Sequence, residues 1–416
     1  MIAIGDIKIK YGTEIALIVL CCRVHFKTED RTALQNFINT SVIDWNDAIF
    51  LSANHRIEPI IYKILQKAII PAEVANRIKQ NQFHLIQNSF KLALETERII
   101  NKLAGHNIRC LTYKGTALSK QLYGDIVSRE SSDIDLVIAT ADFDSVINLM
   151  REDGYTFESL LEYNYYKDDV YKRNKDLSFN KYENDSRQFH VEFHWGVVDP
   201  TSGVKSSANS ALFDETTRME LAKSEVEVLN ISSHYLAVFL HHSVADGFSI
   251  LRDLVDIGQI IFLKDIINTA YINQSISGLR LKKAPAICHF ICKELLGIAV
   301  PLSVSVNLSA SEKDFFIEQL LNKKMLGSNF KAQLFKKSIY YLKDNATDKF
   351  RYLLRSFLLR FTPSRKDIRI FNLPRKLHFL YPVLKPFRSV FSPSTKAEET
   401  EMARQQKKSL FRNNND

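Results

Sequence analysis

Two aspartates at the start of a short apolar run are the residues of this chain best placed to do chemistry. Asp133 and Asp135 flank Ile134, and residues 134–138 read Ile-Asp-Leu-Val-Ile, a pattern typical of a strand. Successive side chains of a strand point to opposite faces, so the two carboxylates project from one face, about 6–7 Å apart along the strand. Mg²⁺ is usually held by one or two carboxylates together with substrate phosphates. The pair therefore predicts a metal and nucleotide site.

A third carboxylate lies on a later segment with strand character. Residues 188–195 read Gln-Phe-His-Val-Glu-Phe-His-Trp, and this alternation places His190, Glu192 and His194 on one strand face. We predict that Glu192 is the third ligand of a site for two Mg²⁺ ions. For both histidines a hydrogen-bonded side chain on a half-buried strand is favoured over metal ligation, more strongly for His190 than for His194.

The turn before the first aspartate has features of a phosphate site. A short apolar run ends at Tyr113, Gly115 breaks it, and residues 116–122 have the pattern of a helix opening. Glycine lets the backbone approach a ligand closely, and the Thr116 hydroxyl and the amides at the helix start can hold a phosphate. Lys114 and Arg129 have two open interpretations, triphosphate contacts or solvated surface charges.

These motifs, in this order, resemble the polymerase-beta type nucleotidyltransferase superfamily. More narrowly, the chain resembles a bacterial family described only as uncharacterised nucleotidyltransferases, over about residues 45–388. Sixteen residues separate Thr116 from Asp133, which is long for the superfamily and similar to the narrower family. The residues that carry the narrower resemblance are Tyr113-Lys114-Gly115, Tyr123, Arg129, Asp133-Ile134-Asp135-Leu136-Val137, Asp153-Gly154-Tyr155 and Glu192-Phe193-His194-Trp195.

The resemblance implies a Mg²⁺-dependent enzyme that transfers a nucleoside monophosphate from a nucleoside triphosphate, ATP foremost, to an unidentified hydroxyl acceptor. Among the possible acceptor classes, the resemblance favours a saccharide. Asp133 and Asp135 are implied to hold both ions, and Glu192 to share the catalytic ion or to act as general base. Arg252 and Asp256 are implied to support the site from the later helices. The implied triphosphate contacts are Lys114, Gly115, Thr116 and Arg129.

The elements around these motifs predict an α+β fold. A small mixed β-sheet core over residues 105–200 is flanked by an N-terminal helical region, residues 1–104, and a C-terminal helical domain, residues 210–345. Residues 199–209, rich in small side chains, mark the boundary between core and C-terminal domain. His241, His242 and Asp246 lie close together in that domain, where they are interpreted as a polar face of an interdomain cleft.

The N-terminus and the cysteines indicate a cytoplasmic protein. Residues 15–22 form an apolar run too short to span a bilayer, so a buried helix is predicted there. The five cysteines are an odd count without the spacing of a disulfide framework. Cys288 and Cys292 are interpreted as buried small side chains rather than as metal ligands.

The net charge of +9 comes from the end of the chain. Residues 346–416 contain 16 Lys and Arg against 6 Asp and Glu, a balance of +10, and the other residues balance to −1. This proline-punctuated tail, predicted to be disordered towards its end, is interpreted as an appendage of the body, with peripheral contact to an anionic membrane as the alternative. Two other functions stay open: a catalytically silent nucleotide-binding or partner-binding module, and, ranked last, a nucleic-acid-binding protein that uses the tail.

Overall fold

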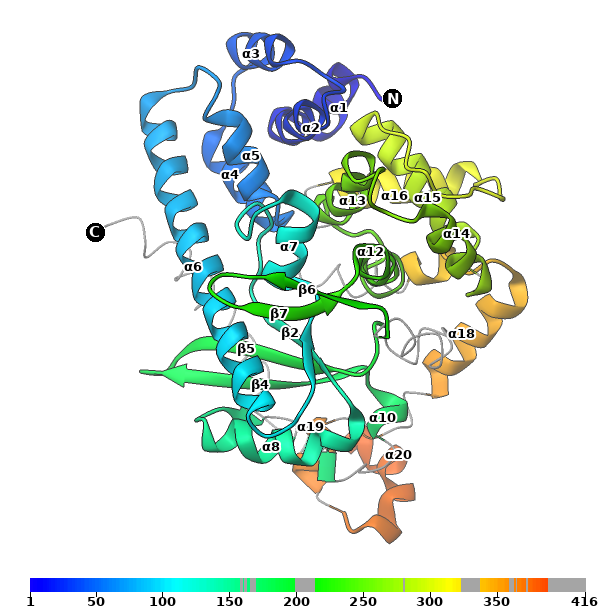
Figure 1. Ribbon diagram of the computed structural model, residues 1–416. Coiled ribbons are helices and arrows are strands. Elements are labelled where there is room, and N and C mark those ends of the chain that lie inside the picture. The colour runs from blue at the N-terminus through cyan, green and yellow to red at the C-terminus, as the bar shows by residue number, and fades with distance from the viewer. Residues whose placement is uncertain are drawn as a thin grey trace. The chain divides into compact units, whose positions relative to one another are not determined.

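The computed structural model describes residues 1–157, 160, 163–164, 170–198, 214–279, 281–322, 337–358, 363, 365–371 and 373–387 (Figure 1). The chain forms two compact units, one of residues 1–157 and 171–352 and the other of residues 158–170 and 353–416. The predicted loop at residues 199–209 and the predicted disordered end of the tail lie outside the described residues. The β-sheet belongs to the first unit.

The described strands form one seven-stranded mixed sheet in the order β3-β4-β5-β2-β1-β7-β6. Two neighbouring pairs, β1 with β7 and β2 with β5, are parallel, and the other neighbours are antiparallel. The predicted α+β fold with a small mixed sheet between helical regions is confirmed. The strands are β1 (Cys110–Thr112), β2 (Ile134–Ile138), β3 (Thr156–Phe157), β4 (Asp176–Glu183), β5 (Ser186–His194), β6 (Thr216–Glu220) and β7 (Glu225–Leu229).

The β4–β5 hairpin sets the face that the site uses. Its two turn residues, Asn184 and Asp185, have φ angles of 48° and 60°, the left-handed conformations that match the twist of two antiparallel strands. One face of the hairpin is apolar, and there Phe179 packs edge-on against Phe193 with ring centroids 5.5 Å apart. The opposite face carries three facing pairs of polar side chains, Asp176 with His194, Ser178 with Glu192 and Asn180 with His190.

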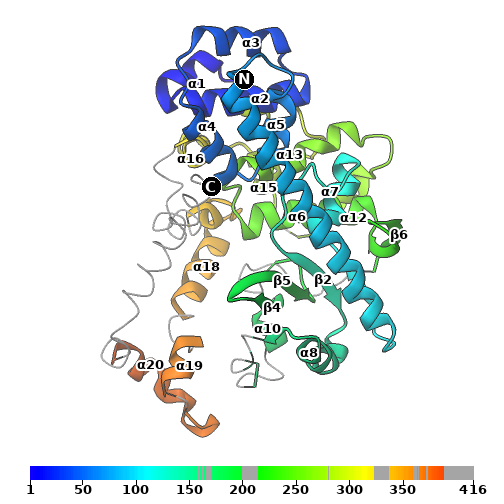
Figure 2. The same ribbon diagram turned by 90° about the vertical axis from the view of Figure 1, so that its left-hand side faces the viewer.

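The N-terminal helices build a core against which the sheet and the later helices pack. Residues 15–22 lie in α2 and are at most 2% exposed, so the predicted buried helix is confirmed. The 33-residue helix α6 contacts β1 and α7. Figures 1 and 2 show this long helix running past the sheet. The helices are α1 (Ile4–Tyr11), α2 (Thr13–Phe26), α3 (Arg31–Thr40), α4 (Trp45–Asn54), α5 (Glu58–Leu65) and α6 (Ala72–Ala104).

The remaining helices lie within and after the sheet segments. The helices between strands are α7 (Gly115–Tyr123), a 3-10 turn η1 (Thr140–Asp142), α8 (Phe143–Glu152) and α10 (Val170–Arg173). Those after the sheet are α12 (Ile231–Leu240), a π-helical turn η5 (His241–Ala245), α13 (Leu251–Gly258), η6 (Gln259–Phe262), α14 (Thr269–Gly278), α15 (Lys283–Ile291), a second π-helical turn η7 (Cys292–Leu296), α16 (Ala310–Leu321), α18 (Ala346–Leu358), α19 (Arg365–Phe371), η10 (Arg375–Leu380), α20 (Tyr381–Leu384) and η11 (Lys385–Phe387).

The cysteines and the apolar helices agree with the sequence-based interpretation. All five cysteines are buried free thiols, as predicted for Cys288 and Cys292. A cytoplasmic location stays a prediction. Among the described helices, none has the length and apolar character needed to cross a membrane.

Gly258 fixes the close packing of α13 and gives a test of the helical core. A Cβ atom at this position would lie 2.7 Å from Ile298 Cδ1 and 2.7 Å from Phe26 Cζ. We expect Gly258→Ala to lower the free energy of unfolding by about 1–3 kcal/mol, because the added methyl overpacks the core. Gly278 ends α14 in open space and is the matched control. Gly278→Ala should leave urea-unfolding stability unchanged or raise it by up to about 1 kcal/mol.

Candidate functional site

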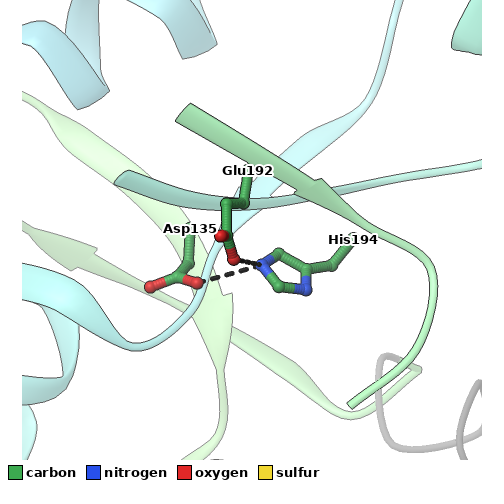
Figure 3. A group of neighbouring side chains, drawn as sticks. All are labelled: Asp135, Glu192 and His194. Carbon is green, nitrogen blue, oxygen red and sulfur yellow. Dashed lines mark hydrogen bonds and ion pairs between the residues drawn. The ribbon is translucent and has the colours of Figure 1, made fainter. Parts of the chain in front are cut away.

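The register of two parallel strands brings the predicted acids together. Asp135 of β2 lies opposite Glu192 of β5, and His194 follows two residues later on the same face of β5. His194 Nε2 lies 2.9 Å from Asp135 Oδ1 and 3.3 Å from Glu192 Oε2, as Figure 3 shows. The ligand atoms of these three side chains all lie within 4.8 Å of one another. The structure therefore places Asp135 and Glu192, from segments 57 residues apart, in one polar cluster.

A buried lysine balances the charge of Asp135. Lys114 Nζ lies 3.3 Å from Asp135 Oδ1 and over the ring of Tyr113. Burial opposes ionisation of Asp135, but Lys114 and His194 outweigh it and hold the pKa of Asp135 below its ordinary value. Burial likewise opposes protonation of Lys114, and Asp135 outweighs it to raise the pKa of Lys114. Both groups are therefore charged at neutral pH.

Glu192 is held by the two histidines of its own strand. Its carboxylate lies 3.3 Å from His190 Nε2 as well as from His194, and His190 Nδ1 lies 2.6 Å from Asn180 Oδ1. Burial opposes ionisation of Glu192, but the hydrogen bonds from His190 and His194 prevail and lower the pKa of Glu192. The predicted hydrogen-bonded role of His190 is confirmed, whereas His194 also belongs to the metal-capable cluster.

Two charged residues at the start of β4, Lys175 and Asp176, extend the cluster of Asp135, Glu192 and His194. Neither of them was predicted from the sequence as a site residue. Lys175 pairs with Asp176, and its Nζ lies 4.0 Å from Glu192 Oε2. Asp176 Oδ2 lies 3.5 Å from His194 Nδ1, across the β4–β5 pair. Burial and the nearby Lys114 lower the pKa of Lys175. The sequence does hold a pattern that could have indicated Asp176. Asp176, Ser178 and Asn180 alternate with other residues, which places all three on the polar face of β4.

The turn into α7 has the strained backbone expected of a ligand-binding loop. Lys114 and Gly115 have φ angles of 54° and 49°, and a residue other than glycine at such an angle is uncommon. The backbone N–H of Lys114 donates to His234 Nε2 at 2.8 Å, and burial lowers the pKa of His234 to about 3, so its ring is a neutral acceptor. Thr116 is buried in the first turn of α7. Phosphate binding by Gly115 and Thr116 stays a prediction.

Asp133 and Arg129 lie outside the cluster of three ligand atoms. Asp133 is half-buried just before β2, with its carbonyl oxygen 3.6 Å from the position of a Cβ atom on Gly115. Arg129 is buried, and its Nε lies 2.8 Å from Asp256 Oδ2. Asp256 also accepts a hydrogen bond from Tyr123 at 2.7 Å. Burial opposes the charge of Arg129, but Asp256, and after it Tyr123 and Asp133, raise the pKa of its guanidinium. Metal binding by Asp133, triphosphate binding by Arg129 and a supporting role of Asp256 stay predictions.

The donor set fits a divalent cation in part. Asp135 and Glu192 present carboxylate oxygens in one place, as Mg²⁺ requires, and Lys114 and Lys175 add the positive charge that a phosphate group needs. The imidazole of His194 is a less usual neighbour for Mg²⁺, because that ion prefers oxygen ligands. The residues that could hold Mg²⁺ here are thus Asp135 and Glu192.

Comparisons with known proteins place these residues in a family. A family model described as "Uncharacterised nucleotidyltransferase" matches residues 41–297, which is more than half of the chain and includes β1 to β7. No curated protein and no solved structure gives a significant match.

Proposed function

Because the chain belongs to the uncharacterised nucleotidyltransferase family, we propose that the face of β2 and β5 carries its transfer reaction. The reaction moves a nucleoside monophosphate from a nucleoside triphosphate, ATP foremost, to a hydroxyl acceptor with Mg²⁺ present. The observation that carries this proposal is the pairing of Asp135 with Glu192 on adjacent parallel strands, beside Lys114. When bound, Mg²⁺ neutralises phosphate charge and lowers the pKa of an acceptor hydroxyl.

The side chains around the two acids have separate tasks in this proposal. Lys114 and Lys175 attract the triphosphate and stabilise negative charge as it develops on the phosphate and the leaving pyrophosphate. His190 and His194 hold the Glu192 carboxylate in one orientation by hydrogen bonds. Glu192 is 22% exposed at its side chain, more than Asp135 at 4%. It is therefore the acid better placed to meet an acceptor hydroxyl, and its lowered pKa favours a role as metal ligand over one as general base.

Nucleotide binding tests the location of the site. We expect a non-hydrolysable ATP analogue to bind the wild type in isothermal titration with Mg²⁺, and to bind Asp135→Asn at least about tenfold more weakly. Asp133→Asn shows whether the other aspartate of the predicted pair takes part, and Glu183→Gln at the far end of β4 is the matched control. Equal affinity in wild type and Asp135→Asn, with other nucleoside triphosphates also tried, would place the nucleotide elsewhere. Binding without turnover would favour the silent-module alternative.

A peripheral membrane contact of the basic tail is a second proposal, and helix α18 supports it. Its apolar side chains repeat at helical spacing and are 45–64% exposed: Phe350, Leu353, Leu354, Phe357 and Leu358. Lys349 and Arg351 flank this stripe on its two sides, at about 100° per residue. An exposed apolar stripe bordered by cations is the pattern of a helix that lies on an anionic bilayer. A saccharide acceptor on a lipid carrier would be reached from such a surface.

Vesicle binding tests this surface. We expect the protein to sediment with phosphatidylglycerol vesicles and much less with phosphatidylcholine vesicles, and we expect added salt to weaken the binding. Leu354→Glu with Phe357→Glu should lower the bound fraction about tenfold or more. Ile69→Glu is the matched control, because Ile69 is 81% exposed in a segment remote in sequence. Equal binding of the α18 variant and the wild type would refute the proposal.

A further inference from the structure

A second group of metal-capable side chains lies in the helices after the sheet. His242 belongs to the π-helical turn η5, Asp246 follows that turn, and Asp253 belongs to α13. His242 Nδ1 lies 3.3 Å from Asp246 Oδ2 and 3.1 Å from Asp253 Oδ1. The three ligand atoms all lie within 4.8 Å of one another. These separations are those of donors that share one ion at bond lengths of about 2.0–2.2 Å.

The other nitrogen of His242 is already engaged by a carboxylate. Nε2 lies 3.0 Å from Asp256 Oδ2, with both side chains buried. A proton on Nε2, donated to Asp256, leaves the lone pair of Nδ1 directed at Asp246 and Asp253. Metal-binding histidines usually donate their second ring N–H to a carboxylate in this way, which fixes the tautomer and the ring orientation.

One carboxylate oxygen of this group lacks a hydrogen-bond donor. Asp253 is fully buried, and its Oδ2 accepts the backbone N–H groups of Ser249 and Ile250. Its Oδ1 faces His242 Nδ1 and accepts no hydrogen bond from any described group. A buried anionic oxygen without a donor is costly, so an unsatisfied one that faces an imidazole nitrogen points to a missing cation. This observation is independent of the distances between the ligand atoms.

We propose that His242, Asp246 and Asp253 bind a divalent first-row transition ion of the Zn²⁺ class. An imidazole nitrogen with two carboxylate oxygens is a donor set that Zn²⁺ uses, whereas Mg²⁺ prefers oxygen alone. His241 Nε2 lies 3.3 Å from Asp246 Oδ2 and supplies a further donor at the edge of the group. The π-helical turn lets two consecutive histidines reach the same aspartate, and such turns frequently mark functional sites. Asp246 is 29% exposed at its side chain and provides the entry path.

This site shares no ligand with the Asp135 cluster, and the inference does not rest on the proposed transfer reaction. The competing occupant is a proton shared by His242 Nδ1 and Asp253 Oδ1, on either atom. The carboxylates around His242 raise the pKa of its ring although burial lowers it. A protonated His242 would pair with Asp246, Asp253 and Asp256 and would bind no metal. The cations that interact with this group include Arg252, next to Asp253 in α13, and Arg129, which pairs with Asp256. Lys175 also interacts with Asp246, and Lys114 with the neighbouring His241.

Titration with Zn²⁺ on the full chain, stripped of metal with a chelator, tests the site. The Asp135, Glu192 and His194 cluster offers the same types of donor and can also take up Zn²⁺, so the variants are compared in a Glu192→Gln background. We expect Glu192→Gln to keep one tightly bound ion, because Glu192 belongs to the other cluster. Asp246→Asn should weaken this binding at least about tenfold, since loss of even a supporting partner of a ligand costs ~10–100-fold in affinity. Asp246 is the variant of choice because its partial exposure lets the chain fold without it.

Cobalt and thermal unfolding give a second readout. Co²⁺ should give visible absorption bands in Glu192→Gln that are lost when Asp246→Asn or His242→Gln is added to that variant. Zn²⁺ should raise the melting temperature of Glu192→Gln and not that of Glu192→Gln with Asp246→Asn. Absence of tight Zn²⁺ binding in the wild type, or unchanged affinity in both Asp246→Asn and Asp253→Asn, would overturn the proposal and leave the proton as the occupant. Loss of binding only in Glu192→Gln would also overturn it.

Discussion

Replacing Glu192 by glutamine is expected to lower turnover by at least about a hundredfold while the protein stays folded. Glutamine keeps the size of the side chain and can still hydrogen-bond to His190 and His194, but it removes the negative charge from the centre of the cluster. General-base groups and groups that stabilise the transition state typically contribute about 10²–10⁴ in rate. A hundredfold loss corresponds to about 2.7 kcal/mol of transition-state stabilisation.

Pyrophosphate release measures this effect without knowledge of the acceptor. The four nucleoside triphosphates are tested with Mg²⁺, first in water alone and then with a panel of saccharides, because the acceptor class is itself part of the proposal. Glu183→Gln keeps the same chemical change on β4 but lies outside the cluster, so it should retain the wild-type rate. Wild-type turnover in Glu192→Gln would remove Glu192 from the reaction. A loss shared equally with Glu183→Gln would indicate a general defect of the hairpin.

Asp135 and Glu192 could be predicted from the sequence, because the direction of a side chain on a strand depends only on its neighbours along the chain. The alternation of residues 188–195 correctly places His190, Glu192 and His194 on one face, and two short apolar strands correctly imply a buried sheet. In the folded sheet, β5 pairs in parallel with β2, and Asp135 lies opposite Glu192. This pairing depends on the order of the strands in the sheet. A single sequence holds no such information, so their proximity had to come from the resemblance to a family.

Asp133 shows where the same local argument stops. Asp133 and Asp135 would point to the same face only if both belonged to one strand. However, β2 begins at Ile134. Asp133 therefore belongs to the irregular segment next to Gly115, where no period governs the direction of its side chain. The β6–β7 hairpin is a second case. It lies within residues 210–345, where the sequence predicts only helices, because its strands are five residues long and β6 is largely exposed.

The polar network of His242, Asp246, Asp253 and Asp256 could not be predicted from the spacing of these residues along the sequence. The sequence shows that His241, His242 and Asp246 lie close together, and it led to their interpretation as a polar face of an interdomain cleft. The chain then turns at Gly247 and Phe248, which have φ angles of 65° and 52°, and α13 returns with Asp253 and Asp256 beside His242. Phe248 in this conformation has no signature in the sequence, because a large residue seldom adopts it. The additional donors thus became visible only in three dimensions.

Removing the carboxylate of Asp256 is expected to destabilise the protein more than any other single change in this network. Asp256 is fully buried and lies 2.8 Å from Arg129 Nε and 2.7 Å from the Tyr123 hydroxyl. Asp256→Ala leaves the guanidinium of Arg129 buried without its partner and the Tyr123 hydroxyl without its acceptor. Breaking a buried pair from one side typically costs about 3–5 kcal/mol, because an uncompensated charge remains in the interior.

A double-mutant cycle separates this cost from the value of the pair itself. Urea unfolding of Asp256→Leu, Arg129→Met and the double variant should show each single change as strongly destabilising and the double change as milder than their sum. Apolar side chains of similar volume often replace a buried ion pair with little loss of folding free energy. We therefore expect the pair of Arg129 and Asp256 to align α13 with the segment after α7 and to add little net stability. Additive effects of the two substitutions would show that Arg129 and Asp256 do not interact in solution. The interpretation of Asp256 as the residue that holds Arg129 beside the site would then fail.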